Sequence, residues 1–403
     1  MVAASQRATA ADELVRPWFS CLEERLGEIA LFDCHTHLGC ADPDGSCFDA
    51  EELQSALELI DARAVVFPLA EPGSYRAAND RTLAAAQAAG GRLVPFCRVD
   101  PRTGAVEELE RAVALGAAGI KLHPRAERFG LADPAVRRIA AFADERRLPI
   151  IVHAGRGIPS LGRDALGLAR AFPDAPIILA HLAIADLAWI WAEAAGQRNL
   201  FFDTAWWNTA DQLALFSLIP PGQILFASDI PYGRTLAAAS VVLRAALAVG
   251  LNAEQIPAIA GGQLERLLAG AEPEDLGPAP MRSAPAPGPL LERIHALLIA
   301  AAARLTAGYP ASEYLELARL ACELPAGHPD APVAASVREL LDRHAAYLAS
   351  DPPRHGPRVP GIHLIFVAAA VARLPGLPLP GPGVLGQQPD DASALLSTTD
   401  GGD

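Results

Sequence analysis

The chain has 403 residues, with 33 Lys and Arg against 47 Asp and Glu, so its formal net charge is −14. This acidic balance argues against a protein built around nucleic-acid phosphates. A hydrophobic fraction of 51% with 20% charged residues indicates a globular core and excludes a chain disordered throughout. No uncharged stretch reaches the roughly 20 apolar residues of a membrane span. Lys121 is the only lysine among the 33 basic residues.

The residues near the N-terminus and the number of cysteines indicate the cellular compartment of the protein. Arg7, Asp12 and Glu13 precede any apolar run, unlike a secretory signal. Six cysteines in so long a chain do not indicate a disulfide framework, and no CxxC pair indicates a structural zinc site. We therefore expect a reduced, cytoplasmic protein without a membrane partner.

Short runs rich in Val, Ile, Leu and Phe alternate with Ala/Leu/Arg/Glu stretches of helical period over residues 30–230. The predicted strands are residues 31–37, 64–69, 93–99, 119–123, 150–153, 177–181, 200–203 and 224–229. The predicted helices that follow them are residues 51–62, 75–89, 106–115, 135–147, 163–172, 184–195, 210–218 and 236–249. Eight strand–helix units favour an α/β fold of the closed (β/α)8 TIM-barrel type. The rival, a doubly wound sheet, would be expected to carry a Gly-rich phosphate loop after the first strand.

Further helices are predicted on both sides of the barrel. An N-terminal helix spans residues 11–26, and a last barrel helix spans 263–268, which closes a first domain at 1–271. Pro and Gly crowd residues 272–289, a composition typical of an extended linker. A helical module of unknown role follows at 290–375, with helices at 290–306, 311–323, 334–349 and 363–374. The Gly/Pro-rich, acidic tail at 376–403 is predicted to be disordered.

The first predicted strand ends in Asp33-Cys34-His35-Thr36-His37. The two-residue period of a strand sets Asp33, His35 and His37 on one face. Two imidazoles at i and i+2 can reach one cation, so this pattern indicates a metal site.

The five histidines of the barrel half all stand where predicted strands end: His35, His37, His123, His153 and His181. In a (β/α)8 barrel this rim holds the active site. The five histidines beyond residue 290 show no such placement and are interpreted as ordinary side chains.

These residues resemble the amidohydrolase superfamily of metal-dependent (β/α)8 barrels, in its amidohydrolase-related branch of hydrolases and aromatic-acid decarboxylases. The resemblance covers about residues 30–270. It rests on His35-Thr36-His37, Gly119-Ile120-Lys121-Leu122-His123-Pro124, His153, His181, Ser228-Asp229-Ile230-Pro231-Tyr232 and the helix from Gly261 to Leu268. Gln263 stands where that family usually has Asn.

The resemblance implies that His35, His37, His153 and Asp229 bind one divalent cation, with zinc the expected ion. Asp229 would be the general base of a metal-bound water, and His181 would hydrogen-bond the substrate oxygen or bind a second metal. Three imidazoles and a carboxylate suit zinc, and a water bound in an open position becomes acidic.

Lys121 shares strand parity with His123, so both should face the barrel interior near its rim. A buried ammonium is costly without a partner or a task. Three roles fit: a cation for a substrate carboxylate, a carboxylated lysine that bridges two metals, or a structural partner of Asp33 or Asp229. The GIKLHP sequence favours the first role, because it resembles the one-metal branch.

Several other residues near the strand ends could contact a substrate. An arginine can bind a carboxylate through two parallel hydrogen bonds, and a tryptophan ring can line a pocket. The candidates, with His123, are Arg98, Arg125, Arg156, Arg234, Trp206 and Trp207. Asp203 ends the seventh strand, and its role is open.

Three functions remain compatible with this sequence. The first is a metal-dependent hydrolase of a C–N or C–O bond in a small, carboxylated or cyclic substrate. The second is a non-oxidative decarboxylase with the same metal cage. The third is a catalytically idle barrel that acts through its helical module. The expected partner is a small anionic molecule, not nucleic acid, and the chain is compatible with a homo-oligomer.

Overall fold

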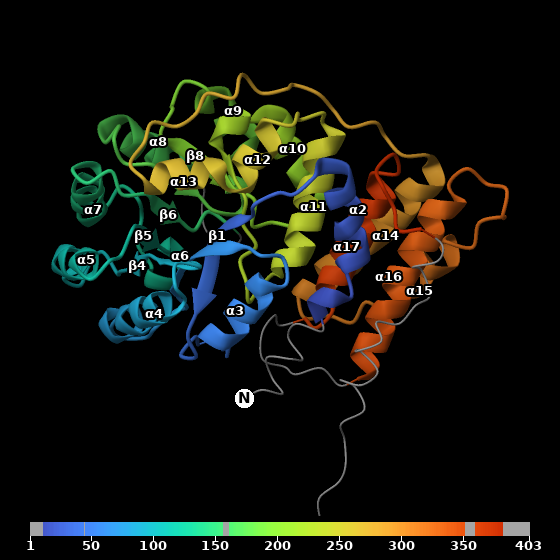
Figure 1. Ribbon diagram of the computed structural model, residues 1–403, viewed down its shortest axis with the longest axis horizontal. Coiled ribbons are helices and arrows are strands. Elements are labelled where there is room, and N and C mark those ends of the chain that lie inside the picture. The colour runs from blue at the N-terminus through green and yellow to red at the C-terminus, as the bar shows by residue number, and fades with distance from the viewer. Residues whose placement is uncertain (1–10, 44, 156–160, 351–358, 382–403) are drawn as a thin grey trace, which may run out of the picture.

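The computed structural model describes residues 11–43, 45–155, 161–350 and 359–381. Figure 1 shows a barrel of strands ringed by helices, with a second group of helices beside it. The strands are β1 (Phe32–Leu38), β2 (Arg63–Pro68), β3 (Leu93–Pro95), β4 (Cys97–Arg98), β5 (Ile120–Leu122), β6 (Ile150–Val152), β7 (Ile177–Leu179), β8 (Leu200–Asp203) and β9 (Ile224–Leu225). All ladder pairs are parallel, in the orders β1-β2-β3 and β4-β5-β6-β7-β8-β9.

Backbone hydrogen bonds close the two sheets into one barrel. The third predicted strand is divided at Phe96, whose N–H donates to Val66 O, so β3 and β4 are one interrupted strand. At the other seam the N–H of Cys34 donates to Phe226 O, and that of His37 donates to Ile230 O. The closed barrel confirms the predicted fold class and excludes the open doubly wound sheet.

The helices of the barrel half follow the strands in alternation. They are α3 (Ala50–Glu58), α4 (Arg76–Ala88), α5 (Ala105–Ala114), α7 (Pro134–Asp144), α8 (Gly162–Ala171), α9 (Leu187–Ala194), α10 (Thr209–Leu218), α11 (Thr235–Ala248) and α13 (Gln263–Leu268). Short helices that sequence periodicity did not indicate are α6 (Pro124–Glu127), α12 (Gln255–Pro257), the 3-10 turns His181–Ala183 and Pro221–Gln223, and a π-helical turn at Ala258–Gly262. They are too short for a periodic pattern to form.

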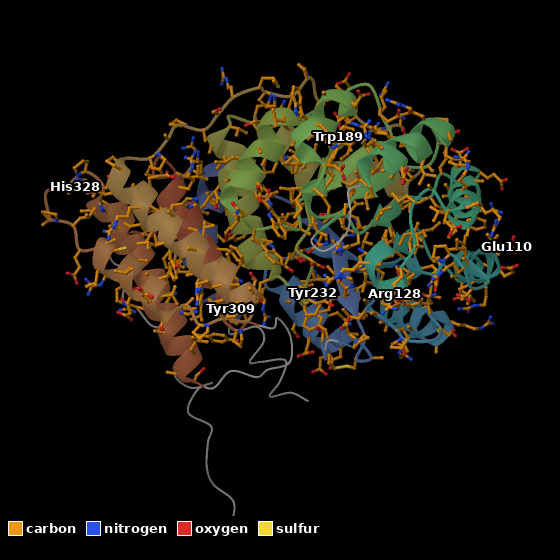
Figure 2. The ribbon with its side chains drawn as sticks, turned by 180° about the vertical axis from the view of Figure 1, so that it is seen from behind. Glu110, Arg128, Trp189, Tyr232, Tyr309 and His328 are labelled. Atoms are coloured by element: carbon orange, nitrogen blue, oxygen red, sulfur yellow. A yellow bond between two sulfur atoms is a disulfide. The ribbon has the colours of Figure 1, made fainter. Side chains whose placement is uncertain are left out.

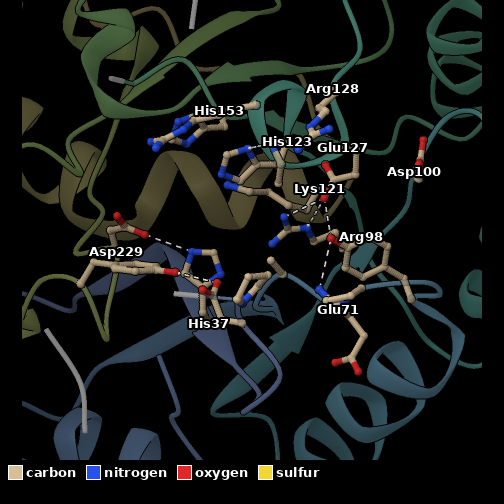
Figure 3. Close-up of a pocket in the computed structure, with 18 of the residues that line it drawn as sticks. His37, Glu71, Arg98, Asp100, Lys121, His123, Glu127, Arg128, His153 and Asp229 are labelled. Atoms are coloured by element: carbon tan, nitrogen blue, oxygen red, sulfur yellow. Dashed lines mark hydrogen bonds and ion pairs between the residues drawn. The ribbon is translucent and has the colours of Figure 1, made fainter. Parts of the chain in front are cut away.

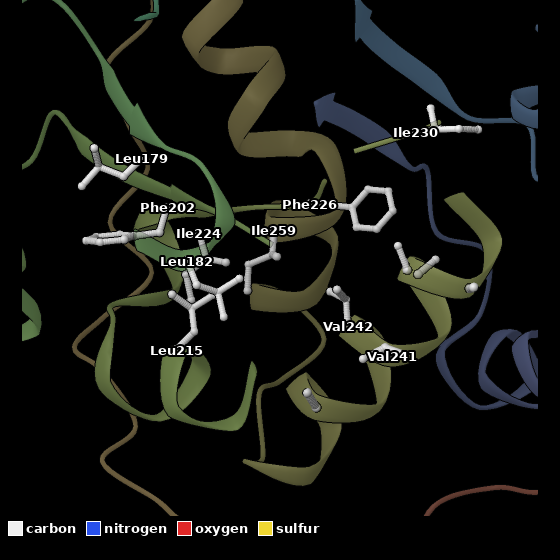
Figure 4. Close-up of a cluster of buried hydrophobic side chains, with 14 of the residues drawn as sticks. Leu179, Leu182, Phe202, Leu215, Ile224, Phe226, Ile230, Val241, Val242 and Ile259 are labelled. Atoms are coloured by element: carbon white, nitrogen blue, oxygen red, sulfur yellow. The ribbon is translucent and has the colours of Figure 1, made fainter. Parts of the chain in front are cut away.

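Two apolar layers hold the barrel. Alternate strand residues such as Val65, Ile151 and Phe201 fill its interior. Their neighbours face outward and pack against the helices. Figure 4 shows part of this outer layer, where Leu179, Phe202 and Ile224 lie near Leu215 and Ile259.

The second group of helices consists of α14 (Pro289–Thr306), α15 (Ser312–Ala321), α16 (Ala331–Ala349) and α17 (Ile362–Arg373). Helix α17 packs between α14 and α16 and against α11. The N-terminal helix α2 (Arg16–Leu26) also joins this group, because the buried Trp18 Nε1 donates to Ser336 Oγ at 2.7 Å. Seen from behind, His328 and Tyr309 lie on this side and Glu110 lies at the far end of the barrel (Figure 2).

The segment between α13 and α14 has no helix or strand. This segment runs along the outside of the barrel (Figure 1). The Met281 N–H donates to Ser217 O. Of the predicted disordered tail, residues 382–403 lie outside the described residues. Residues 376–381 correct that prediction, because Leu377 and Leu379 pack on the core and Pro378 O accepts from Arg244. The predicted domain boundaries stay a prediction.

One disulfide, between Cys40 and Cys47, corrects the expectation of a fully reduced chain. Gly39 and Phe48 exchange two backbone hydrogen bonds at 2.9 Å, and this antiparallel pair sets the two adjacent cysteines opposite each other. Among the described residues, no helix combines the length and apolarity that a bilayer span requires.

A buried ion pair between Asp12 and Arg234 makes stability depend on pH. Burial raises the pKa of the Asp12 carboxyl from its usual 3.8 to about 6, against the pull of Arg234. The folded chain therefore holds this proton more tightly than the unfolded chain, and the resulting stabilisation is full below about pH 4 and lost as pH rises through about 6.

We expect the free energy of unfolding of the wild type to fall relative to that of Asp12→Asn by up to about 3 kcal/mol between pH 4 and pH 6.5, at about 1.4 kcal/mol per pKa unit. Denaturant titrations of both proteins across this range measure the difference. Parallel pH profiles would contradict the prediction.

Candidate active site

Charged side chains collect at the carboxyl ends of the strands, around a cavity of about 710 Å³. Strand alternation brings several of them inward. Ile120 and Leu122 belong to the outer apolar layer, so Lys121 between them faces the interior. On β6, Ile151 faces the interior and His153, two residues on, does the same.

Two histidines reach the cavity by other means. The pairing register of β1 shifts between Asp33 and Thr36, so Cys34 joins the interior cluster while His35 and His37 still reach the cavity. His181 follows the end of β7 and turns inward at a left-handed φ of 57°. Strict alternation from Ile178 would point it outward. Its inward direction therefore depends on the turn rather than the strand period.

One carboxylate oxygen of Asp229 lies close to both histidines of β1. Asp229 Oδ1 lies 3.2 Å from His35 Nε2 and 3.0 Å from His37 Nε2. Figure 3 shows Asp229 and His37 together on one side of the cavity. Ligand atoms of His35, His181 and Asp229 all lie within 4.8 Å of one another. The described residues thus include a potential His-His-Asp metal site.

Asp203 orients two of these histidines. His35 Nδ1–H donates to Asp203 Oδ2 at 2.7 Å, and Asp203 Oδ1 accepts the backbone N–H of His181 at 2.7 Å. The proton on Nδ1 leaves His35 Nε2 with a lone pair that accepts from Lys121 Nζ at 3.0 Å. This is also the tautomer that a metal ligand needs. Asp203, whose role the sequence leaves open, is thus a hydrogen-bond partner of both His35 and His181.

The hydrogen bond of His181 favours the second of its two predicted roles, that of a metal ligand. His181 Nδ1–H donates to the carbonyl of Ala205 at 2.8 Å, and burial lowers the pKa of this imidazole. Neutral His181 therefore has an unprotonated Nε2, which cannot donate to a substrate oxygen. This nitrogen lies 3.0 Å from His153 Nδ1 and can accept a hydrogen bond or bind a metal.

His153 and His123 form a second layer above this cluster. Their rings stack at a centroid distance of 3.9 Å. His153 Nε2 is buried and has no hydrogen-bond partner among the described residues. His153 is not one of the three residues whose ligand atoms group within 4.8 Å. His123 Nδ1 accepts from Ala126 N–H, so its Nε2–H is left to donate.

Burial controls the charges of the site. Desolvation lowers the pKa of His35, His37 and His153 well below 6.5, and nearby cations add to this effect. It also raises the pKa of Asp229 well above 3.8, against the pull of Lys121. Lys121 is fully buried 3.0 Å from His35 Nε2, and burial lowers its pKa to about 7 despite the attraction of Asp229 and Asp203.

Two of the arginines predicted to bind the substrate, Arg98 and Arg234, are held in buried ion pairs. Arg98 is buried, pairs with Glu127 at 2.8 Å and donates to Pro68 O at 3.1 Å, so its guanidinium is already occupied. Arg234 pairs with Asp12 beneath α17 and does not line the active-site cavity. Arg98 nevertheless lines the active-site cavity, and the predicted contacts of both arginines with a substrate stay predictions. Arg156 lies outside the described residues.

Arg125 lines the cavity, and its predicted contact with a substrate stays a prediction. Arg128, which sequence reasoning missed, lines the same cavity. Both are exposed and have no ion-pair partner among the described residues. Trp206 and Trp207 also line the cavity, and Trp206 Nε1 donates to Asp211 at 2.6 Å.

Sequence reasoning also missed Tyr75, Glu127 and Tyr232. Tyr75 donates its hydroxyl to Glu127, whose second oxygen has no hydrogen-bond partner among the described residues. Tyr232 was visible only as a neighbour of Asp229 in the sequence. Tyr75 and Glu127 follow no strand-end pattern, because they lie on or before the helices α4 and α6.

The spacing of the cluster fits a divalent cation. Two ligands about 2.1 Å from one tetrahedral ion are roughly 3.4 Å apart, close to the 3.2 Å between His35 Nε2 and Asp229 Oδ1. The bare His153 Nε2 adds an unused donor nearby. Imidazole nitrogens with a carboxylate are a donor set typical of zinc and similar ions.

A closed parallel barrel with this cluster at its carboxyl rim defines a (β/α)8-barrel enzyme. The chain belongs to the amidohydrolase family, because the amidohydrolase family model matches residues 32–267. A search of curated protein sequences finds no match.

Solved structures match part of this chain at low identity. A 2,6-dihydroxybenzoate decarboxylase complexed with 2,6-dihydroxybenzoate is 15% identical and covers 60% of this chain and 98% of its own, with a TM-score of 0.50. A 2,6-dihydroxybenzoate decarboxylase from Rhizobium is 15% identical over 60% of this chain and 99% of its own, with a TM-score of 0.47. A 4-oxalomesaconate hydratase from Rhodopseudomonas palustris is 18% identical over 60% and 96%, with a TM-score of 0.44.

Proposed function

We propose that this enzyme is a metal-dependent hydrolase that acts on a small carboxylated substrate. The observation that carries the proposal is the convergence of His35 Nε2 and His37 Nε2 on Asp229 Oδ1, at 3.2 and 3.0 Å, on the wall of a cavity of about 710 Å³. The cavity volume suits a small organic molecule.

His35, His37 and Asp229 would hold the cation, with His181 and His153 as further donors. A divalent ion held there would polarise a substrate carbonyl and lower the pKa of a bound water toward 7. The hydrogen bond from His35 to Asp203 keeps the Nε2 lone pair available for this task.

Asp229 is the residue best placed to move the proton. Its carboxylate lines the cavity beside both histidines. In the hydrolysis we propose, the water oxygen forms a bond to the carbonyl carbon and Asp229 takes the water proton. The C–N or C–O bond then breaks, and Asp229 returns that proton to the leaving nitrogen or oxygen.

The opposite wall would bind the substrate carboxylate. Arg125 and Arg128 reach this wall without an ion-pair partner among the described residues, and a guanidinium binds a carboxylate through two hydrogen bonds. His123 Nε2–H supplies a further donor. These groups favour an anionic substrate despite the negative net charge of the chain.

A second candidate, non-oxidative decarboxylation, is favoured by Lys121. Its Nζ lies 3.0 Å from His35 Nε2 at the inner end of the cavity. An ammonium there could hold the scissile carboxylate or give a proton to the carbon that loses CO2. Both candidates use the same ligands, and their products differ.

The test is a product assay on the purified protein with and without added Zn²⁺, Mn²⁺ or Co²⁺. A panel of carboxylated lactones, carboxylated cyclic amides and hydroxybenzoates is followed by acid release and by CO2 release. We expect metal-dependent acid release without CO2. Release of CO2 alone would establish the decarboxylase instead, and a protein that binds none of the three ions would overturn both.

A further inference from the structure

A short loop between β1 and α3 forms one wall of the cavity. Its described residues are 39–43 and 45–48, and Asp42 and Pro43 line the cavity. Two hydrogen bonds between Gly39 and Phe48 and the disulfide between Cys40 and Cys47 close the loop at its base. Cys40 is exposed, so external thiols can reach the disulfide.

The closed loop contacts the hydroxyl of Tyr232 twice. Tyr232 donates to Asp42 Oδ2 at 3.1 Å, and the buried hydroxyl of Ser46 hydrogen-bonds to the same phenol. Tyr232 comes from the segment after β9, three residues beyond Asp229. The two contacts therefore tie the β1 loop to the segment that carries the carboxylate of the cluster.

The ring of Tyr232 also packs against His37. The two rings meet edge to face at 88°, with their centroids 5.7 Å apart. His37 in turn lies 3.0 Å from Asp229 Oδ1. The Tyr232 ring thus limits the rotation of one proposed metal ligand, and the loop holds the Tyr232 hydroxyl.

We propose that Tyr232 is a positioning residue for the His37–Asp229 pair and that the Cys40–Cys47 disulfide sets how firmly Tyr232 is held. The inference rests on the proposed metal site. Among the described residues, reduction of the disulfide leaves the Gly39–Phe48 hydrogen bonds to hold the base of the loop. Tyr232 then loses the fixed positions of Asp42 and Ser46, and the ligand pair becomes less preorganised.

The redox step requires an external dithiol. One thiolate of the dithiol attacks Cys40 Sγ, the bond to Cys47 Sγ breaks, and Cys47 leaves as a thiolate that takes up a proton. The second thiol of the reagent then displaces Cys40, which also leaves as a thiol. Two electrons and two protons pass from the dithiol to the protein, and the dithiol becomes a disulfide.

The test measures Co²⁺ affinity and the visible Co²⁺ spectrum of the full-length protein before and after reduction with dithiothreitol, which is removed before the titration. A gain of two titratable thiols over the four free cysteines of the oxidised protein reports reduction of the disulfide. We expect reduction to weaken Co²⁺ binding by about fivefold and to change the spectrum. Tyr232→Phe in the oxidised protein should weaken binding by about tenfold, the lower end for a residue that orients a ligand. Reduction of the Tyr232→Phe variant should weaken its Co²⁺ binding further by less than about twofold.

Two controls isolate the effect. Cys40→Ser/Cys47→Ser should bind Co²⁺ like the reduced wild type and should not respond to dithiothreitol, which excludes metal capture by the new thiols. Tyr309→Phe, at an exposed tyrosine beyond α14, should behave like the wild type. Circular dichroism and the melting temperature confirm that each variant is folded.

The outcomes separate this inference from the proposed function. If oxidised wild type binds no Co²⁺, the proposed metal site fails. If it binds Co²⁺ and neither reduction nor Tyr232→Phe changes the affinity or the spectrum, the metal site stands and the inference is wrong. A response of Tyr232→Phe to reduction as large as that of the wild type would also overturn it, because the disulfide would then act through another contact.

Discussion

Replacement of Asp229 by Asn is expected to remove bound metal and to lower kcat by about 10³- to 10⁴-fold. The asparagine keeps the shape of the side chain, but it removes the negative charge shared by His35 and His37 and the base proposed for proton transfer. Metal content by emission spectrometry and a Co²⁺ titration measure the first effect. Turnover of any substrate found in the product assay measures the second.

A matched control is Asp61→Asn, because the Asp61 side chain is 93% exposed and pairs only on the surface with Arg92. We expect this variant to keep wild-type metal content and turnover. An Asp229→Asn protein with full metal content and full activity would show that the metal and the base lie elsewhere. His35→Ala, compared with His328→Ala in the helical module, repeats the test on a second ligand.

Arg98→Leu should lower the free energy of unfolding by about 3–5 kcal/mol, the usual cost of leaving one partner of a buried ion pair uncompensated. Arg98 is 1% exposed, and Glu127 would lose its counter-ion in the same buried environment. Denaturant unfolding measures the change. If Arg98 instead clamps the substrate, stability should be unchanged and KM should rise.

The double variant Arg98→Leu/Glu127→Leu separates the loss of the pair from the loss of packing. Removal of both charges should recover most of the lost stability, because apolar residues of similar volume often replace a buried pair without cost. A double variant as unstable as Arg98→Leu alone would mean that the lost contact with Pro68 O, rather than the unpaired Glu127, dominates.

The barrel was predictable because its signal is local. Each strand is a run of apolar residues, and each helix has its own period, so the eight units can be read from neighbouring residues. The inward direction of Lys121 follows from the same period. Its neighbours Ile120 and Leu122 face the outer layer, as alternation requires. The two histidines of His35-Thr36-His37 were visible from the same two-residue period.

Turns and register shifts were the first features that the sequence pattern could not predict. The position of His181 depends on a left-handed φ after β7, and the β1 register shifts within the sequence that carries His35. Neither feature changes the pattern of apolar residues. The disulfide also depends on a turn, since it forms only where Gly39 and Phe48 pair.

The second limit of prediction from the sequence was which charged side chains pair with each other. The sequence by itself determined the barrel, the rim on which the histidines gather and the acidic balance of the chain. Only the tertiary structure decided that Glu127 occupies Arg98, that Asp12 removes Arg234 from the cavity, and that Asp203 orients His35. Asp203 is 168 residues from His35, and Asp12 is 222 residues from Arg234. A period describes which way a side chain points, whereas an ion pair depends on which distant side chain the closed barrel brings within about 3 Å.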